Sequence, residues 1–150
     1  MLVRDLMQSD VVTLEASDSL DLADDIMRLG RIRHMPVVSG GRLVGLVSQR
    51  DLFRASVSSV LQLRREAERE WLAKIPVQGV MTTHLFTIGP EAPVRDAIEL
   101  MVDKRIGCLP VVEDGTLVGL LGESDCLRYL ARLLDISEEK SALPELPPAT

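Results

Sequence analysis

Residues 32–54 read IRHMPVVSGGRLVGLVSQRDLFR, and residues 106–128 read IGCLPVVEDGTLVGLLGESDCLR. The two stretches align without a gap, so that Pro36 falls on Pro110 and Asp51 falls on Asp125. The same offset continues toward the N-terminus, where Met7 falls on Met81. A register kept over that length identifies an internal repeat.

The first copy predicts the order β-α-β-β-α, and the second copy repeats it. A short β run at 11–14 precedes a helix at 20–29, and two further β runs meet at a turn. Gly41 stands in that turn where a tight hairpin needs a positive φ, and a second helix begins near Gln49. We therefore expect an α/β (α+β) fold. A unit this small needs a partner for its exposed faces, so the copies should pack with pseudo-twofold symmetry and two matching clefts.

The predicted boundaries are repeat 1 at 1–55, a helical linker at 56–75, repeat 2 at 76–135 and a flexible tail at 136–150. The linker lacks glycine and is followed by Pro76, which predicts an extra helix between the repeats. That helix either covers the sheet or contacts a second copy or an effector. The tail is rich in proline, which favours a frayed end.

Composition narrows the class of protein. The net charge of −6 and the 3% of aromatic residues argue against a nucleic-acid partner. Two cysteines are too few for a disulfide scaffold and fit a reducing compartment. No signal peptide and no membrane span stand out, so we expect a cytoplasmic protein with no membrane partner.

The junction between the second hairpin strand and the following helix has two interpretations. Ser48 followed three residues later by Asp51 resembles a capping box. The same carboxylate, at the first turn of a helix beside a cleft, is also suited to accept hydrogen bonds from the two hydroxyls of a ribose. The free N–H groups of that helix end favour an anion.

The paired motifs resemble those of the cystathionine-β-synthase (CBS) domain. They are the strands HMPVV and CLPVV, the junction Gly-hydrophobic-hydrophobic-Ser-x-x-Asp, and lead-in segments that end at Met7 and Met81. Two copies resemble a CBS pair, or Bateman module, over about residues 1–55 and 75–135. The resemblance implies clefts between the repeats that bind AMP, ADP, ATP or S-adenosylmethionine, and sometimes NAD or a cyclic dinucleotide. It also implies a disc-like homodimer that regulates an effector.

The resemblance assigns site residues. Ser48 and Asp51 match the hydroxyl and the ribose-binding acid, and Asp125 matches the acid of the second copy. Gly122 departs from the Ser or Thr that is usual there, which weakens the second motif. Because one repeat of the family supplies the acid and the other the base pocket, Asp51 should face Thr87, Ile106, Gly107, Cys108 and Pro110. Likewise, Asp125 should face Val12, Thr13, Ile32, Arg33, His34 and Pro36.

The remaining chemistry-bearing residues are few. Arg33 and His34 either contact phosphate or form the solvated end of a helix. No spacing of His and Cys suggests a metal site, and no catalytic constellation is visible. We expect a regulatory module that is not an enzyme, has no cofactor besides its regulatory ligand, and signals to a protein effector. The alternative is a ligand-free dimerisation module.

Overall fold

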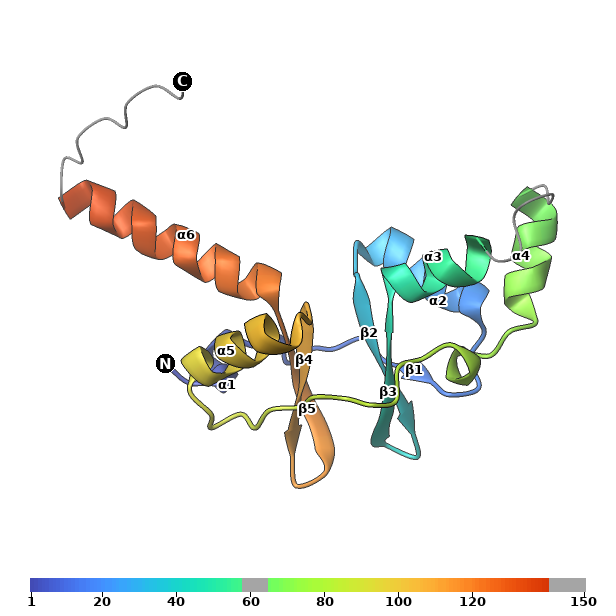
Figure 1. The fold of residues 1–150 in the computed structure, drawn as a ribbon, viewed down its shortest axis with the longest axis horizontal. Coiled ribbons are helices and arrows are strands. Elements are labelled where there is room, and N and C mark those ends of the chain that lie inside the picture. Colours follow the sequence, from blue (N-terminus) through green and yellow to red (C-terminus); the bar gives the residue numbers. More distant parts are fainter. Residues whose placement is uncertain (58–64, 141–150) are drawn as a thin grey trace, which may run out of the picture.

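The structure is a computed structural model that describes residues 1–57 and 65–140. It has a five-stranded sheet and helices in two halves, which Figure 1 shows side by side. This mixed fold confirms the predicted fold class. The elements are α1 (Val3–Leu6), β1 (Leu14–Glu15), α2 (Leu20–Gly30), β2 (His34–Ser39), β3 (Arg42–Ser48), α3 (Gln49–Val57), α4 (Arg65–Ala73), the 3₁₀ helix η1 (Val77–Gly79), α5 (Val94–Lys104), β4 (Cys108–Glu113), β5 (Thr116–Gly122) and α6 (Glu123–Lys140).

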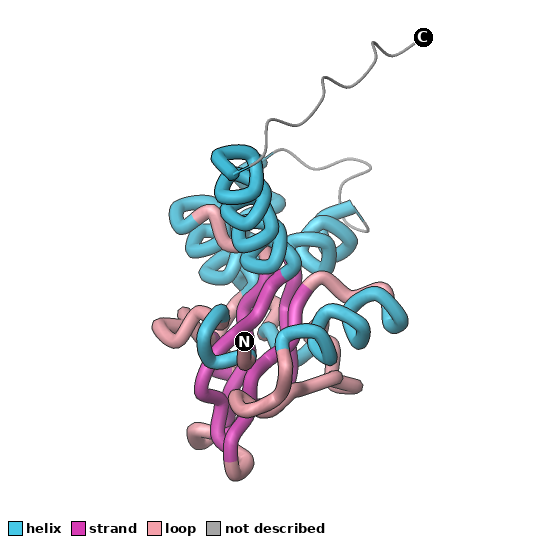
Figure 2. Tube along the Cα trace, turned by 90° about the vertical axis from the view of Figure 1, so that its left-hand side faces the viewer, coloured by secondary structure: helices cyan, strands magenta, loops and turns pink. Residues whose placement is uncertain are grey.

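Each half contains the same antiparallel hairpin in the same register. His34 lies opposite Ser48 in the β2–β3 pair, and the equivalent residues Cys108 and Gly122 lie opposite each other in the β4–β5 pair. Figure 2 shows the strands of both halves side by side, with the hairpin turns at one end of the molecule. The repeat in the sequence is therefore a repeat in the structure, while the pseudo-twofold relation between the halves stays a prediction.

The hairpin turns have the backbone that the glycines predict. Gly41 has a φ of 79° and Gly115 has a φ of 80°, values that favour glycine. The residue before each of them also has a positive φ, as a two-residue type I′ turn requires. Beside these turns Arg42 pairs with Thr116 and joins the hairpins into one sheet of order β1-β2-β3-β5-β4.

The first β run of each half is shorter than the sequence predicts. The run expected at 11–14 is observed as β1, Leu14–Glu15. Its repeat equivalent, expected at 85–88, is reduced to a single parallel bridge between Ile88 and Val111. In the first half the ladder continues, because the Ala16 amide donates to a β2 carbonyl at 3.1 Å. Its equivalent in the second half is Pro90, which has no N–H to donate, so the ladder stops there.

The lead-in segment of each copy packs on the other half. Val3 of α1 is fully buried in the core formed by α5 and the β4–β5 hairpin. Val77 of η1 is fully buried in the core formed by α2 and the β2–β3 hairpin. Backbone pairs repeat this exchange, with Gln8 bonded to Leu120 and Thr82 bonded to Leu46. Neither core is complete without a segment contributed by the other copy.

Two strand glycines make room for this exchange. A Cβ atom on Gly45 would lie 2.3 Å from the sulfur of Met81, and a Cβ atom on Gly119 would lie 2.5 Å from the sulfur of Met7. Such distances are far inside van der Waals contact. The lead-in methionines therefore lie directly over strand positions that only glycine can occupy in this arrangement.

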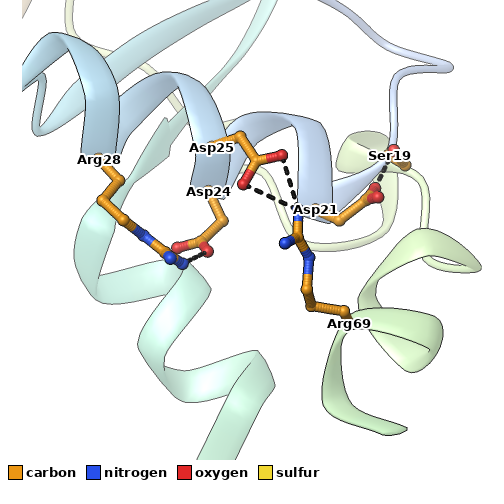
Figure 3. A network of polar contacts seen from close by, with 6 residues as sticks. All are labelled: Ser19, Asp21, Asp24, Asp25, Arg28 and Arg69. Atoms are coloured by element: carbon orange, nitrogen blue, oxygen red, sulfur yellow. Dashed lines mark hydrogen bonds and ion pairs between the residues drawn. The ribbon is translucent and has the colours of Figure 1, made fainter. Parts of the chain in front are cut away.

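The predicted helix between the repeats is present as α4, which packs against α2. Figure 3 shows Arg69 of α4 paired with Asp25 of α2, at 3.0 Å. Leu72 of α4 is buried in the first core, so the helix covers that half. Residues 58–64 of the linker and 141–150 of the tail lie outside the described residues, and α6 extends beyond residue 135 to Lys140.

The Met–Gly contacts predict a stability cost for a single methyl group. Gly119→Ala should lower the free energy of unfolding by about 1–3 kcal/mol, because its Cβ meets both Met7 and the Gln8 carbonyl. Urea denaturation of the full chain measures this change. Gly89→Ala is the matched control, since a Cβ there meets nothing within 4 Å. Equal stability of the two variants would contradict the packing described above.

Candidate functional site

Ser48 and Asp51 form a reciprocal hydrogen-bonded cap at the start of α3. The Ser48 amide donates to Asp51 Oδ2 at 2.8 Å, and the Asp51 amide donates to Ser48 Oγ at 3.2 Å. The Ser48 hydroxyl also donates to Oδ2, at 2.9 Å. The capping interpretation is thus confirmed, and it uses only one carboxylate oxygen. Within the described part of the chain, no donor is bonded to Asp51 Oδ1.

Asp51 borders a cleft of about 160 Å³ between the two halves, which we call the first cleft. The structure places Ser48 and Asp51 across this cleft from second-repeat residues, as the sequence predicts. Four of the five predicted second-repeat residues line it, namely Ile106, Gly107, Cys108 and Pro110. First-repeat residues on the opposite side include His34 and Leu46. The predicted residues of both repeats therefore share this cleft, and their role in binding a ligand stays a prediction.

The connecting segment between η1 and α5 forms a further wall of the first cleft. Thr87, which was predicted to face Asp51, is exposed and does not line it. The lining residues of this segment are Thr82, His84, Leu85 and Phe86. These residues line the cleft because of the path of the chain. The chain pairs with β3 at Thr82, then runs along the cleft, and afterwards pairs with β4 at Ile88. The repeat offset does not reveal that path.

A larger groove of about 730 Å³ lies next to the first cleft, and His34, Ser48, Ile106 and Gly107 line both. We call it the arginine groove, because its walls include Arg33, Arg50 and Arg105. Glu123 is the acidic residue among its lining residues. The apolar residues that line the groove belong mainly to α5 and to the start of α6. Arg33 and His34 therefore lie beside the first cleft.

Burial keeps two polar groups of the first cleft uncharged. It lowers the pKa of His34 from its ordinary 6.5, against the opposing charges of Glu123 and Asp51. It also raises the pKa of the Cys108 thiol to about 12, and Glu123 contributes to that rise. At neutral pH the imidazole is therefore mostly neutral and the thiol protonated, so neither contributes a formal charge.

The second junction, Gly122 to Asp125 at the start of α6, differs from the first. The Gly122 amide donates to Asp125 Oδ2 at 2.9 Å, which repeats half of the cap. The other carboxylate oxygen, Oδ1, accepts from Gln8 Nε2 at 3.0 Å and from Arg128 Nη2 at 2.6 Å. Asp125 is only 7% exposed. Sequence reasoning missed Gln8. The signal that could have found it is the alignment of Gln8 with Thr82, because a long amide side chain in one repeat takes the place of a short hydroxyl side chain in the other.

The residues predicted to face Asp125 are distributed differently. Val12 and Thr13 are exposed, Ile32 packs against the first core, and Pro36 is fully buried. Arg33 and His34 line the arginine groove, and His34 also lines the first cleft. The bonded neighbours of Asp125 are instead Gly122, Gln8 and Arg128. A ligand-binding role of this predicted set stays a prediction.

The described residues offer neither a metal site nor a membrane-spanning helix. Among residues 1–57 and 65–140, no three His, Cys, Asp or Glu side chains gather in a way that would hold a metal ion. None of the helices in those ranges combines the length and apolar character that crossing a membrane requires.

Comparison with known proteins identifies the family. The model of the CBS domain matches residues 3–58 and again residues 77–132. The protein therefore belongs to the CBS domain family and carries two such domains. A CBS domain-containing protein of Dictyostelium discoideum is 33% identical over 137 residues, which are 90% of this chain and 94% of that protein. An inosine-5'-monophosphate dehydrogenase of Korarchaeum cryptofilum is 35% identical, but the match covers 77% of this chain and only 21% of that enzyme.

Solved structures show the same architecture. A Vibrio cholerae protein with a provisional assignment to acetoin utilization has a TM-score of 0.77 and 33% identity, over 98% of each chain. The CBS domain pair of protein MJ0100, in complex with 5'-methylthioadenosine and S-adenosylmethionine, has a TM-score of 0.74 and 25% identity. That match covers 87% of this chain and 99% of the other. This molecule therefore belongs to the class of proteins in which two CBS domains fold as a pair.

Proposed function

We propose that this CBS pair is a regulatory module that binds an adenine nucleotide in the first cleft. The observation that carries the proposal is that no described residue donates to Oδ1 of Asp51, a residue that borders a cleft lined by both repeats. A carboxylate oxygen is an acceptor only, and the adjacent hydroxyls of a ribose are donors that it can bind. The pair MJ0100, which binds adenosyl ligands, supports the same class of ligand.

The apolar walls of the first cleft suit the base. Leu46, Phe86, Ile106 and Pro110 lie around it and offer surface for a flat heterocycle. Such pockets are mostly apolar, with a few polar groups that orient the ligand. With the ribose at Asp51, the base would contact side chains from both repeats. The ligand would then bridge the two halves of the molecule.

The arginine groove favours a phosphate over the positively charged sulfur of S-adenosylmethionine. Arg33, Arg50 and Arg105 give it three permanent positive charges against the single carboxylate of Glu123. Arginine binds phosphate oxygens through two parallel hydrogen bonds. Because the groove shares lining residues with the first cleft, a nucleotide placed with its ribose at Asp51 can direct its phosphates into it. AMP, ADP and ATP are therefore the preferred ligands.

Binding across two halves provides a way to signal. A ligand that contacts both repeats favours the relative placement in which its contacts are best, and an effector can distinguish that state. The module would act by binding, without a catalytic step, in the cytoplasm. The enzyme from Korarchaeum supports this reading, because the matched region is only a fifth of its length. The alternative, a ligand-free interaction module, predicts no nucleotide binding.

The first test is Asp51→Asn in a calorimetric titration with AMP and ATP. The asparagine oxygen can still accept from the Ser48 amide, which retains the cap and points an NH₂ donor at the cleft. We expect unchanged folding and at least tenfold weaker binding, the equivalent of about one hydrogen bond to a charged group. Asp114→Asn, the same change at a hairpin turn, is the matched control. Equal affinity in both variants would contradict the proposed role of Asp51, and no binding by the unaltered chain would favour the alternative.

We also propose a homodimer that pairs the helices of the second repeat. Ile98 and Val102 of α5 and Leu127 and Leu130 of α6 are between 41% and 69% exposed. The first three also line the arginine groove, so the interface would border that groove. At the positions equivalent to Ile98 and Val102, the first repeat carries the ion pair of Asp24 with Arg28, seen in Figure 3. An interface with twofold symmetry brings a surface against itself, so apolar residues of two second repeats would meet. An interface between the second repeat of one chain and the first repeat of the other would instead place these apolar residues against the ion pair of Asp24 and Arg28.

Val102→Asp tests this dimer, because it places a charge at an exposed position of the apolar face. We expect the sedimentation coefficient to change from that of a dimer to that of a monomer at the same protein concentration. Leu29→Asp introduces the same charge at an exposed α2 position, where the second repeat already has Asp103, and should leave the dimer intact. A monomeric unaltered chain, or equal dissociation by both variants, would refute the interface.

A further inference from the structure

Besides Ser48 and Gly122, the two junctions differ at a pair of equivalent residues that directly follow the lead-in segments. Thr82 and Gln8 occupy the same place in the repeat. Both exchange two backbone hydrogen bonds with the neighbouring strand, Thr82 with Leu46 and Gln8 with Leu120. Their backbones therefore hold equivalent positions, and the difference between them lies in the length and chemistry of their side chains.

Those side chains leave the two acids in different states. Thr82 lines the first cleft but makes no hydrogen bond to Asp51 among the described residues. Gln8 reaches Asp125 and donates to its Oδ1 at 3.0 Å. That oxygen is the counterpart of the one left free on Asp51. Gln8 thus takes the acceptor that a ribose would need.

The arginine on each second helix does not by itself explain the difference. Arg128 donates to Asp125 Oδ1 at 2.6 Å, and its equivalent in the first repeat is Arg54. Within the described part of the chain, Arg54 makes no ion pair with Asp51. Both repeats have this arginine, yet it is bonded only at the second junction, where Gln8 is also bonded. Gln8 donates to Asp125 Oδ1, whereas its equivalent Thr82 donates nothing to Asp51 among the described residues, so the residue after the lead-in methionine is the difference that bears on this oxygen.

We propose that Gln8 is an internal occupant of the second junction, so that each chain binds one nucleotide, in the first cleft. The residue after the lead-in methionine, Thr82 or Gln8, determines which junction is open to a ligand. This inference rests on the proposed function and adds the stoichiometry and its structural cause. A ligand at the second junction would have to displace Gln8 from a carboxylate that is 7% exposed. Losing one hydrogen bond to a charged group corresponds to roughly a ten- to hundredfold loss in affinity.

Gly122 contributes less directly to the closed junction, and the structure allows it to be converted. A Cβ atom on Gly122 would lie 3.4 Å from Asp125 Oδ2 and 3.6 Å from Ser124 Oγ, which are ordinary contacts. Serine therefore fits there and supplies the hydroxyl that Ser48 supplies in the first repeat. The double variant Gln8→Thr with Gly122→Ser gives the second junction the residues that the first carries at these two positions.

The experiment is a calorimetric titration of the full chain with AMP, with the melting temperature confirming that each variant is folded. The unaltered chain should bind one AMP per chain, and the double variant should bind two. Gly122→Ser alone is the matched control, because it adds the hydroxyl but retains Gln8, and it should still bind one. Thr82→Gln should weaken the single site of the unaltered chain at least tenfold, since the new amide can reach Asp51.

The outcomes separate this inference from the proposed function. Two AMP per unaltered chain, or one per double variant, would overturn the role of Gln8 and leave nucleotide binding intact. Unchanged affinity in Thr82→Gln would overturn it as well. Absence of AMP binding by both the unaltered chain and the double variant would refute the proposed function, and this inference with it.

Discussion

The exchange of lead-in segments is the constraint on which the rest of the structure depends. Val3 completes the core of the second half, and Val77 completes the core of the first, so neither half can bury its apolar surface alone. Met7 and Met81 lie over glycines that admit no side chain. This crossing fixes how the halves meet. It also brings residues 82–86 along the joint, where they become a wall of the first cleft.

The same scaffold supports two chemically different junctions. At the first, the cap uses one oxygen of Asp51, and no described residue donates to the other; Asp51 borders a cleft that shares lining residues with the arginine groove. At the second, both oxygens of Asp125 are bonded within the chain. Neutral His34 and Cys108 line the first cleft and leave its charge to Asp51 and the nearby arginines. Both copies of the repeat therefore have the same fold, but among the described residues a carboxylate oxygen without a bonded donor is found at Asp51 and not at Asp125.

Much of this arrangement could be predicted from local sequence. The hairpin turns follow from glycines that need a positive φ, and the helices begin where the repeat offset places them. Ser48 and Asp51 were predicted to face Thr87, Ile106, Gly107, Cys108 and Pro110, because the family resemblance pairs an acid of one repeat with a pocket of the other. The chain path from Thr82 to Phe86 could not be predicted, since it depends on tertiary packing. The bond of Gln8 to Asp125 joins residues far apart in sequence, and only the crossing of the lead-in segments brings them together.

We infer that a nucleotide binds at the head of α3 and not at the head of α6. Amide chemical-shift mapping of the isotope-labelled full chain, titrated with AMP to saturation, tests it most directly. The account predicts that the largest shifts fall on residues 48–51, 82–86 and 106–108, with Gly122 and Asp125 little changed. Largest shifts at Gly122 and Asp125, or a spectrum that AMP does not alter, would contradict it.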